Sequence, residues 1–116
     1  MKVFVYGTLK KGYGNNVLVR NAKFIEDRVI QGYELLYAGF PVAVPSETSS
    51  ILGEVYEISD DDDFTLSRLD RLESEGKMYN RIEVDGCQMY VGNKSFWGSY
   101  SLRKCPKTEE NVYYWE

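Results

Sequence analysis

The residue with the clearest chemical meaning in this sequence is Glu73, an acidic side chain on the apolar face of a predicted helix. On a helical wheel of residues 64–76, drawn at about 100° per residue, the apolar stripe is centred near Leu69 and Glu73 falls inside it. A carboxylate on an inward face is costly unless it is paired or reaches water. One interpretation is that Glu73 faces a pocket, where burial raises its pKa and lets it exchange protons near neutral pH.

A structural interpretation of Glu73 stays open beside this one. The side chain could reach solvent at the end of the helix, or form an ion pair with Arg81 or Arg71. Periodicity alone does not separate a buried proton carrier from a paired acid, so both interpretations are carried forward.

A second candidate is the step from strand to glycine loop at residues 5–9, where Tyr6, Gly7, Thr8 and Leu9 follow an apolar run. Backbone N–H groups that leave a strand at a glycine can converge on an anion or a developing oxyanion. The alternative is an ordinary turn, which is the more common role of a glycine in this position.

The amino-acid composition limits which kinds of catalytic and metal site the chain can form. The chain of 116 residues has no histidine and two cysteines, so Ser–His and Cys–His nucleophile pairs and histidine zinc sites are excluded. Any acid–base step must use Asp, Glu, Lys, Tyr or water.

The net charge of −4 argues against a nucleic-acid partner, and the longest apolar runs are too short for a membrane span. These features favour a reduced, cytoplasmic protein without a targeting segment.

Four consecutive aspartates, Asp60–Asp63, could be taken for a metal site. We favour a charged helix start instead, because neighbouring helical residues point in different directions. We expect Ser59 to cap this helix and Gly76 to end it. No metal site is therefore predicted at these aspartates.

The elements that must position these residues are mostly strands. Alternating or apolar runs predict them, and polar stretches such as Ser46–Ser50 and Asn93–Pro106 predict loops and irregular structure. A short helix is expected at Val17–Val19, capped by Asn15 or Asn16, and a turn at Asp85-Gly86 joins two strands into a hairpin. The predicted strands are Lys2–Val5, Lys23–Tyr37, Ile51–Ile58, Tyr79–Val84, Cys87–Val91 and Val112–Trp115.

Strands that are seldom separated by crossover helices argue against a doubly wound parallel sheet. We expect an α+β fold: a small mixed or antiparallel β-barrel with one or two flanking helices. The length favours a single domain over residues 1–116.

An ordered set of short motifs over roughly residues 3–91 resembles the gamma-glutamylcyclotransferase-like (AIG2-like) family. The first motif is similar to the YGTL signature of the family, and the later ones are similar to its proline segment, its G-E-V-Y strand, its L-D-x-x-E helix end and its Y-x-R strand start. In this sequence they are Tyr6–Leu9, Gly39–Val44, Gly53–Ile58, Leu69–Glu73 and Tyr79–Arg81.

The resemblance implies a small curled barrel and an enzyme that needs no cofactor or metal. Its activity would be the release of 5-oxoproline from a small gamma-glutamyl amine or peptide. Carried over by motif, the catalytic acid/base falls on Glu73, the backbone of Tyr6 to Leu9 would hold the glutamyl group, and Tyr79 would lie near the substrate.

One departure from the family pattern leaves an alternative open. The family often places Gly directly after its catalytic Glu, whereas here Ser74 and Glu75 precede Gly76, so Glu75 could be the matching acid. The L-D-x-x-E spacing and the helical wheel both favour Glu73. A further alternative is a binding module on the same fold, which holds a small ligand or a protein without turnover.

Overall fold

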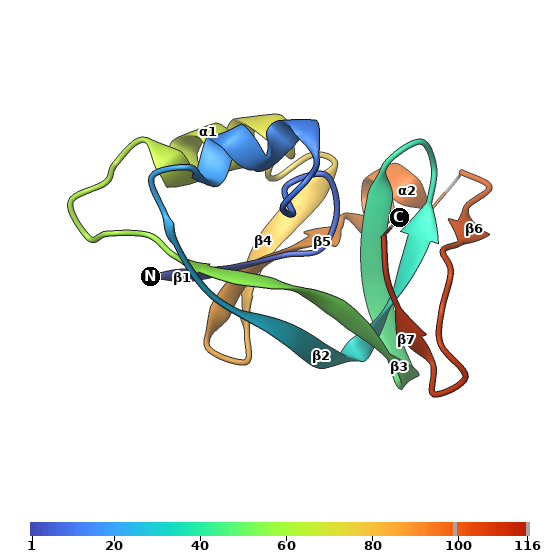
Figure 1. Ribbon diagram of the computed structural model, residues 1–116. Coiled ribbons are helices and arrows are strands. Elements are labelled where there is room, and N and C mark those ends of the chain that lie inside the picture. The colour runs from blue at the N-terminus through green and yellow to red at the C-terminus, as the bar shows by residue number, and fades with distance from the viewer. Residues whose placement is uncertain (99, 116) are drawn as a thin grey trace.

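The protein is described here by a computed structural model that covers residues 1–98 and 100–115 (Figure 1). Its main element is a curled mixed sheet with the strand order β4-β5-β1-β3-β2-β6, and β7 pairs with β3. The strands are β1 Lys2–Val5, β2 Lys23–Tyr37, β3 Pro41–Glu57, β4 Tyr79–Val84, β5 Cys87–Gly92, β6 Arg103–Lys104 and β7 Val112–Tyr113. The helices are the 3-10 helix η1 Gly14–Val19, α1 Thr65–Leu72 and α2 Lys94–Trp97. The expected α+β class, with a small curled sheet and few helices, is confirmed.

β1 lies in the middle of the sheet, between antiparallel β3 and parallel β5. Its side chains are buried on both faces, which explains its continuous apolar run. Val3 and Val5 pack against the helical layer, where Leu69 of α1 and Val19 of η1 lie, and Phe4 packs into the inside of the curl. In Figure 1, α1 and η1 lie side by side over β1.

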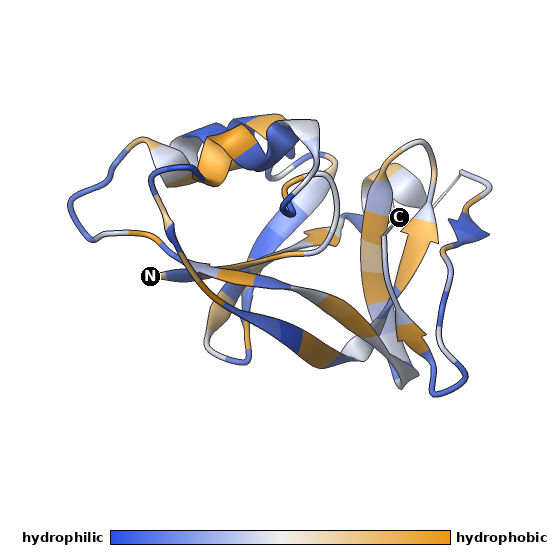
Figure 2. Cartoon of the chain, in the orientation of Figure 1, coloured by the Kyte–Doolittle hydropathy of each residue, from blue (hydrophilic) through white to orange (hydrophobic). Residues whose placement is uncertain are grey.

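The long β2–β3 hairpin gives the sheet its curl. Its register shifts between Phe24 and Glu26 and again between Gln31 and Tyr33, where Gly32 has a φ of 95°. Such irregularities bend the strand pair and increase its twist. The hairpin therefore turns upward at its far half (Figure 1), and hydrophobic and hydrophilic segments alternate along it (Figure 2).

The prediction of a loop at Ser46–Ser50 is wrong, because β3 continues through these residues. Ser50 and Ile51 pair with Val112 and Tyr113 of β7. A strand from far along the chain thus holds a polar stretch in extended conformation. The segment Asn93–Pro106 also contains more order than expected, since it forms α2 and β6; residue 99 within it lies outside the described residues.

Two predicted helix signals are also corrected. α1 begins at Thr65 rather than after Ser59, because the Asp62 carboxylate accepts hydrogen bonds from the N–H groups of Phe64 and Thr65 at 3.1 and 3.0 Å. The helix ends at Leu72, well before Gly76. The aspartates before Asp62 therefore lie in a turn that precedes the helix.

The short helix expected at Val17–Val19 exists as η1, but neither asparagine caps it. Asn15 donates to the Thr8 hydroxyl at 2.9 Å, and Asn16 donates to the Leu9 carbonyl at 2.7 Å. Both side chains therefore fix the loop that follows β1. Among the described residues, no helix is long and apolar enough to cross a membrane.

Candidate active site

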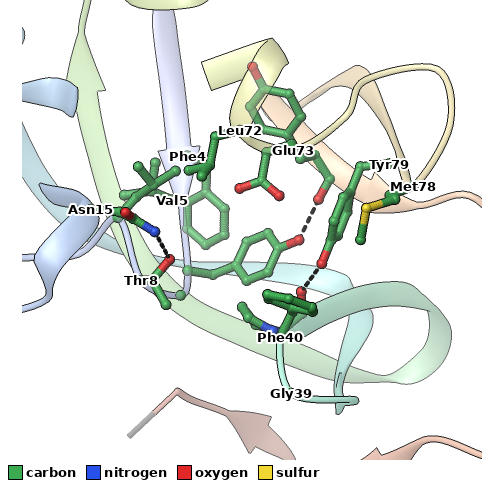
Figure 3. Close-up of a pocket in the computed structure, with 15 residues that line it drawn as sticks. Phe4, Val5, Thr8, Asn15, Gly39, Phe40, Leu72, Glu73, Met78 and Tyr79 are labelled. Carbon is green, nitrogen blue, oxygen red and sulfur yellow. Dashed lines mark hydrogen bonds between the residues drawn. The ribbon is translucent and has the colours of Figure 1, made fainter. Parts of the chain in front are cut away.

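A cavity of about 290 Å³ opens where β1 ends, between the end of α1, the β4–β5 hairpin and the turn that joins β2 to β3 (Figure 3). Its wall is mainly apolar and aromatic, with a few polar groups, which is typical of a small-molecule site. The lining residues are Phe4, Val5, Tyr6, Gly7, Thr8, Leu9, Asn15, Gly39, Phe40, Pro41, Leu72, Glu73, Met78, Tyr79 and Tyr90. All six residues singled out from the sequence as site residues are in this wall.

The loop after β1 forms one side of the cavity. Among the described residues, the N–H groups of Gly7, Thr8 and Leu9 donate to no protein acceptor, while the Gly7 carbonyl accepts from Lys10 N at 3.1 Å. Gly7 is required by close packing, because a Cβ built on it would lie 2.3 Å from Cγ of Pro41. Residues whose backbone N–H groups have no protein acceptor among the described residues thus line the cavity, and such groups are typical donors to an anion.

Glu73 is placed by the way α1 ends. It is the C-cap residue, and its N–H donates to the Leu69 carbonyl at 3.0 Å. Ser74 has a φ of 48°, and Glu75 N donates back to the Asp70 carbonyl at 2.9 Å, which is the Schellman pattern of helix termination. Ser74 therefore occupies the left-handed position that usually takes glycine, so the backbone after Glu73 has the conformation that a Glu-Gly pair would supply.

The Glu73 carboxyl points into the cavity between Phe4 and Tyr79 (Figure 3). In the part of the chain that the structure describes, it accepts no hydrogen bond and forms no ion pair. Burial alone raises its pKa from 4.5 to about 7. The arrangement leaves a single carboxyl that can exist in either protonation state near neutral pH.

The ion pairs considered for Glu73 are not formed. The Arg81 guanidinium donates instead to Asp70, with its Nε 2.9 Å from Oδ1, and Arg71 is exposed. Glu75 is also exposed, outside the cavity wall, where its carboxylate accepts from the Arg81 backbone N–H at 3.3 Å. Of the two acids that the motif comparison left open, only Glu73 lines the cavity.

Three tyrosines line the cavity together with Glu73. The Tyr79 hydroxyl donates to the Pro41 carbonyl at 2.6 Å, and the Tyr6 hydroxyl donates to the Tyr90 carbonyl at 2.7 Å. Burial, together with the nearby Glu73 carboxylate, raises the pKa of Tyr6 and Tyr79. For Tyr90, burial and its hydrogen bond to Asp70 are the main causes of a raised pKa. All three stay neutral and act as fixed donors or apolar walls.

Sequence reasoning missed several lining residues, chiefly Phe40, Pro41, Met78 and Tyr90. Phe40 lies in the turn between β2 and β3, and Pro41 is the first residue of β3; the sequence of such a junction gives no sign of what it faces. In the sequence, Tyr90 resembles any inward-facing residue of a strand. Its place in the site follows from the sheet order, which puts β5 next to β1. Asp60–Asp63 line no part of this cavity, and among the described residues no three acidic or thiol side chains gather to hold a metal ion.

The raised pKa of Glu73 predicts a specific dependence of stability on pH. Between pH 4.5 and about 7, the folded protein holds the Glu73 proton more tightly than the unfolded chain does. The free energy of unfolding therefore carries a favourable term that is complete below pH 4.5 and is lost as pH rises to about 7, on the order of 3 kcal/mol.

Urea unfolding of the wild type and of Glu73→Gln at pH 4.5, 6 and 8 measures this term. The variant should lack it, so we expect similar stability at the lowest pH and a more stable variant at pH 8. An identical decline in both proteins would show that Glu73 is not the group responsible.

The fold and the cavity define a class of small α+β protein. A curled half-barrel encloses the Glu73 carboxyl, which has no hydrogen-bond or ionic partner among the described residues, beside the loop after β1. A family model described as gamma-glutamyl cyclotransferase, AIG2-like, matches residues 3–114. The chain belongs to this family. The resemblance noted from its motifs is thus confirmed over most of its length.

Similar proteins come from bacteria and archaea. The gamma-glutamylcyclotransferase family protein YtfP of Escherichia coli K12 is 40% identical over 82 residues, which are 70% of this chain and 69% of YtfP. The solution structure of E. coli YtfP has a TM-score of 0.64 at 33% identity and covers 90% of this chain and 92% of that one. The crystal structure of the uncharacterized protein PH0828 from Pyrococcus horikoshii has a TM-score of 0.71 at 29% identity and covers 90% and 83%.

Proposed function

We propose that this protein is a gamma-glutamylcyclotransferase that releases 5-oxoproline from a gamma-glutamyl amine or peptide, with Glu73 as its general acid/base. The observation that carries the proposal is the Glu73 carboxyl: it faces the cavity, has no ionic partner among the described residues, and has a pKa raised to about 7. A general acid/base works best when its pKa lies near the operating pH.

The reaction begins with the α-ammonium of the bound glutamyl group. The Glu73 carboxylate takes a proton from it, and the freed nitrogen attacks the γ-carbonyl carbon of the same glutamyl group. A five-membered ring closes, and the carbonyl oxygen becomes an oxyanion. Glu73 then gives this proton to the departing amine nitrogen, and the oxyanion returns to a carbonyl as the bond between the γ-carbon and that nitrogen breaks. The ring nitrogen releases its second proton to the Glu73 carboxylate, which passes it to the departing amine, so 5-oxoproline and an ammonium leave and Glu73 is ionised again.

The loop after β1 is suited to stabilise the charges of this reaction. We assign the N–H groups of Gly7, Thr8 and Leu9 to the glutamyl group, as donors to its carboxylate or to the developing oxyanion. The hydrogen bonds from Asn15 and Asn16 keep this loop in place, so its donors need little reorganisation during the reaction. Tyr6 and Tyr79 would contact the glutamyl chain.

The size of the expected acceleration follows from the intramolecular attack. Holding a reactant in the ring-closing conformation supplies much of the rate, because effective molarities of oriented intramolecular reactions reach about 10⁵–10⁸ M. General acid/base catalysis by one carboxyl adds on the order of 10²–10⁴-fold. No step needs a cofactor. The two buried free thiols, Cys87 and Cys105, agree with a reducing compartment, so we place the enzyme in the cytoplasm.

A panel of gamma-glutamyl compounds tests the proposal. We expect the purified protein to form 5-oxoproline from at least one of gamma-glutamyl amino acids, gamma-glutamyl-ε-lysine and glutathione, detected by mass spectrometry. Calorimetry with the same panel separates an enzyme from a binding module. Binding without product over hours would overturn the proposal in favour of a module, and neither binding nor product would overturn both.

A further inference from the structure

Beside the cavity, a hydrogen-bond network joins the side chain of Asp70 on α1 to those of Arg81, Tyr90 and Gln88 on the β4–β5 hairpin. Asp70 Oδ1 accepts from Arg81 Nε at 2.9 Å and from the Tyr90 hydroxyl at 2.6 Å, and Asp70 Oδ2 lies 3.4 Å from Arg81 Nη2. Arg81 and Tyr90 face each other across β4 and β5. Arg81 Nη1 also donates to Gln88 at 2.8 Å. One carboxylate thus ties the last turn of α1 to a cross-strand pair of the hairpin.

The same helix turn carries two acids with opposite surroundings. Asp70 and Glu73 are three residues apart, which places side chains of a helix about 5–6 Å from each other at Cβ. Asp70 accepts hydrogen bonds from the Arg81 guanidinium and the Tyr90 hydroxyl, whereas Glu73 accepts none among the described residues. The Tyr90 ring lines the cavity, but its hydroxyl proton is directed to Asp70 rather than to Glu73.

We propose that Asp70 is a positioning residue for Glu73, which holds the Arg81 guanidinium and the Tyr90 hydroxyl away from the cavity so that the Glu73 carboxyl stays without a partner. This inference rests on the proposed function of Glu73. The opposite charges of Arg81 and Asp70 offset each other, so neither charge dominates the electrostatic potential at the Glu73 carboxyl.

The groups that face Glu73 are few, which makes its titration a sensitive reporter. They are the hydroxyls of Tyr6 after β1 and Tyr79 on β4 and the ring of Tyr90 on β5, and no lysine or arginine side chain of the described residues lines the cavity. Any cation released toward this cavity should therefore lower the pKa of Glu73, and any uncompensated anion beside it should raise it.

Two substitutions are predicted to act in opposite directions. In Asp70→Asn, Arg81 loses its carboxylate and Tyr90 is free to donate to Glu73, so the pKa of Glu73 should fall by about one pH unit. In Arg81→Gln, the Asp70 charge stays without its cation, so the pKa of Glu73 should rise. The double variant Asp70→Asn/Arg81→Gln should return it toward the wild-type value.

The pKa of Glu73 is measured by ¹³C NMR titration of the glutamate carboxyls, with the Glu73 signal assigned by its loss in Glu73→Gln. This readout needs no turnover, so it fails or succeeds independently of the proposed reaction. If turnover is observed, the acid limb of kcat/KM should move in the same directions. The control is Asp63→Asn, an exposed acid before α1, which should leave the titration unchanged.

Opposite shifts for the two single variants, with recovery in the double variant, would support the proposal. Shifts of the same sign in both would show that the network only maintains the fold. No shift in either would show that Asp70 does not influence Glu73. Thermal melts of each variant confirm that the titrated species is folded.

Discussion

Glu73→Gln is expected to lower kcat/KM for the turned-over gamma-glutamyl compound by at least about 100-fold while the fold is kept. The amide has nearly the shape of the carboxyl, but it cannot accept and return a proton near neutral pH. The loss corresponds to roughly 3 kcal/mol of transition-state stabilisation. The rate of 5-oxoproline formation under subsaturating substrate measures it.

Glu75→Gln is the matched control, because Glu75 is an exposed glutamate two positions away and outside the cavity wall. It should change kcat/KM little. An active Glu73→Gln together with an inactive Glu75→Gln would show that the motif register is shifted by two residues. If Glu73→Gln kept its activity and lost stability at pH 8, Glu73 would be a structural residue.

Gly7→Ala is expected to impair both stability and activity. Its added Cβ would lie 2.3 Å from Cγ of Pro41 and 3.2 Å from Cβ, and a proline ring cannot rotate out of the way. Overpacking of this kind typically costs about 1–3 kcal/mol. The carbonyl of Pro41 also holds the Tyr79 hydroxyl, so relief of the clash moves two walls of the cavity, and a shift of about 1 Å can cost on the order of 100-fold in rate.

Gly14→Ala provides the comparison for this substitution. A Cβ on Gly14 meets nothing within 4 Å, and its backbone lies outside the left-handed region. Urea midpoints and initial rates of both variants should show a loss in Gly7→Ala alone. Unchanged values in Gly7→Ala would mean that the loop and Pro41 can separate without consequence, and the role given to this loop would be wrong.

Local signals predicted those parts of the fold that depend on neighbours in the chain. The Asp85-Gly86 turn is an example: both residues have positive φ, 53° and 77°, as a two-residue hairpin turn requires, and β4 and β5 pair around it. The same holds for β1, whose apolar run reflects burial on both faces.

Features that depend on distant partners could not be predicted. Ser46–Ser50 is polar, and it is extended because β7 pairs beside it. The start of α1 differs from the prediction because Ser59 is a typical capping residue in the sequence, and only in the folded chain does Asp62 accept from the N–H groups at the helix start. Such choices depend on tertiary contacts that a single sequence does not display.

In the candidate site too, local features could be predicted from the sequence, and features that depend on distant partners could not. Glu73 was recognisable because helical periodicity places an acid where an apolar residue belongs. Its isolation was not recognisable, because the sequence offered Arg81 as an equally good partner. Only the geometry of β4 and β5 directs Arg81 to Asp70, and the contribution of Tyr79 came from the family resemblance rather than from periodicity.

The central place of β1 has a consequence for how the molecule folds. Residues 2–5 pair with residues 54–57 on one side, and residues 3–4 pair with residues 88–89 on the other, so the middle of the sheet depends on long-range contacts. The β2–β3 hairpin can form from local contacts, whereas β1 gains its second neighbour only when the β4–β5 hairpin docks. Loop closure over such separations is slow, so the folding rate should be set by this docking step. The cavity, which lies between the loop after β1 and that same hairpin, is then completed only in the final stage of folding.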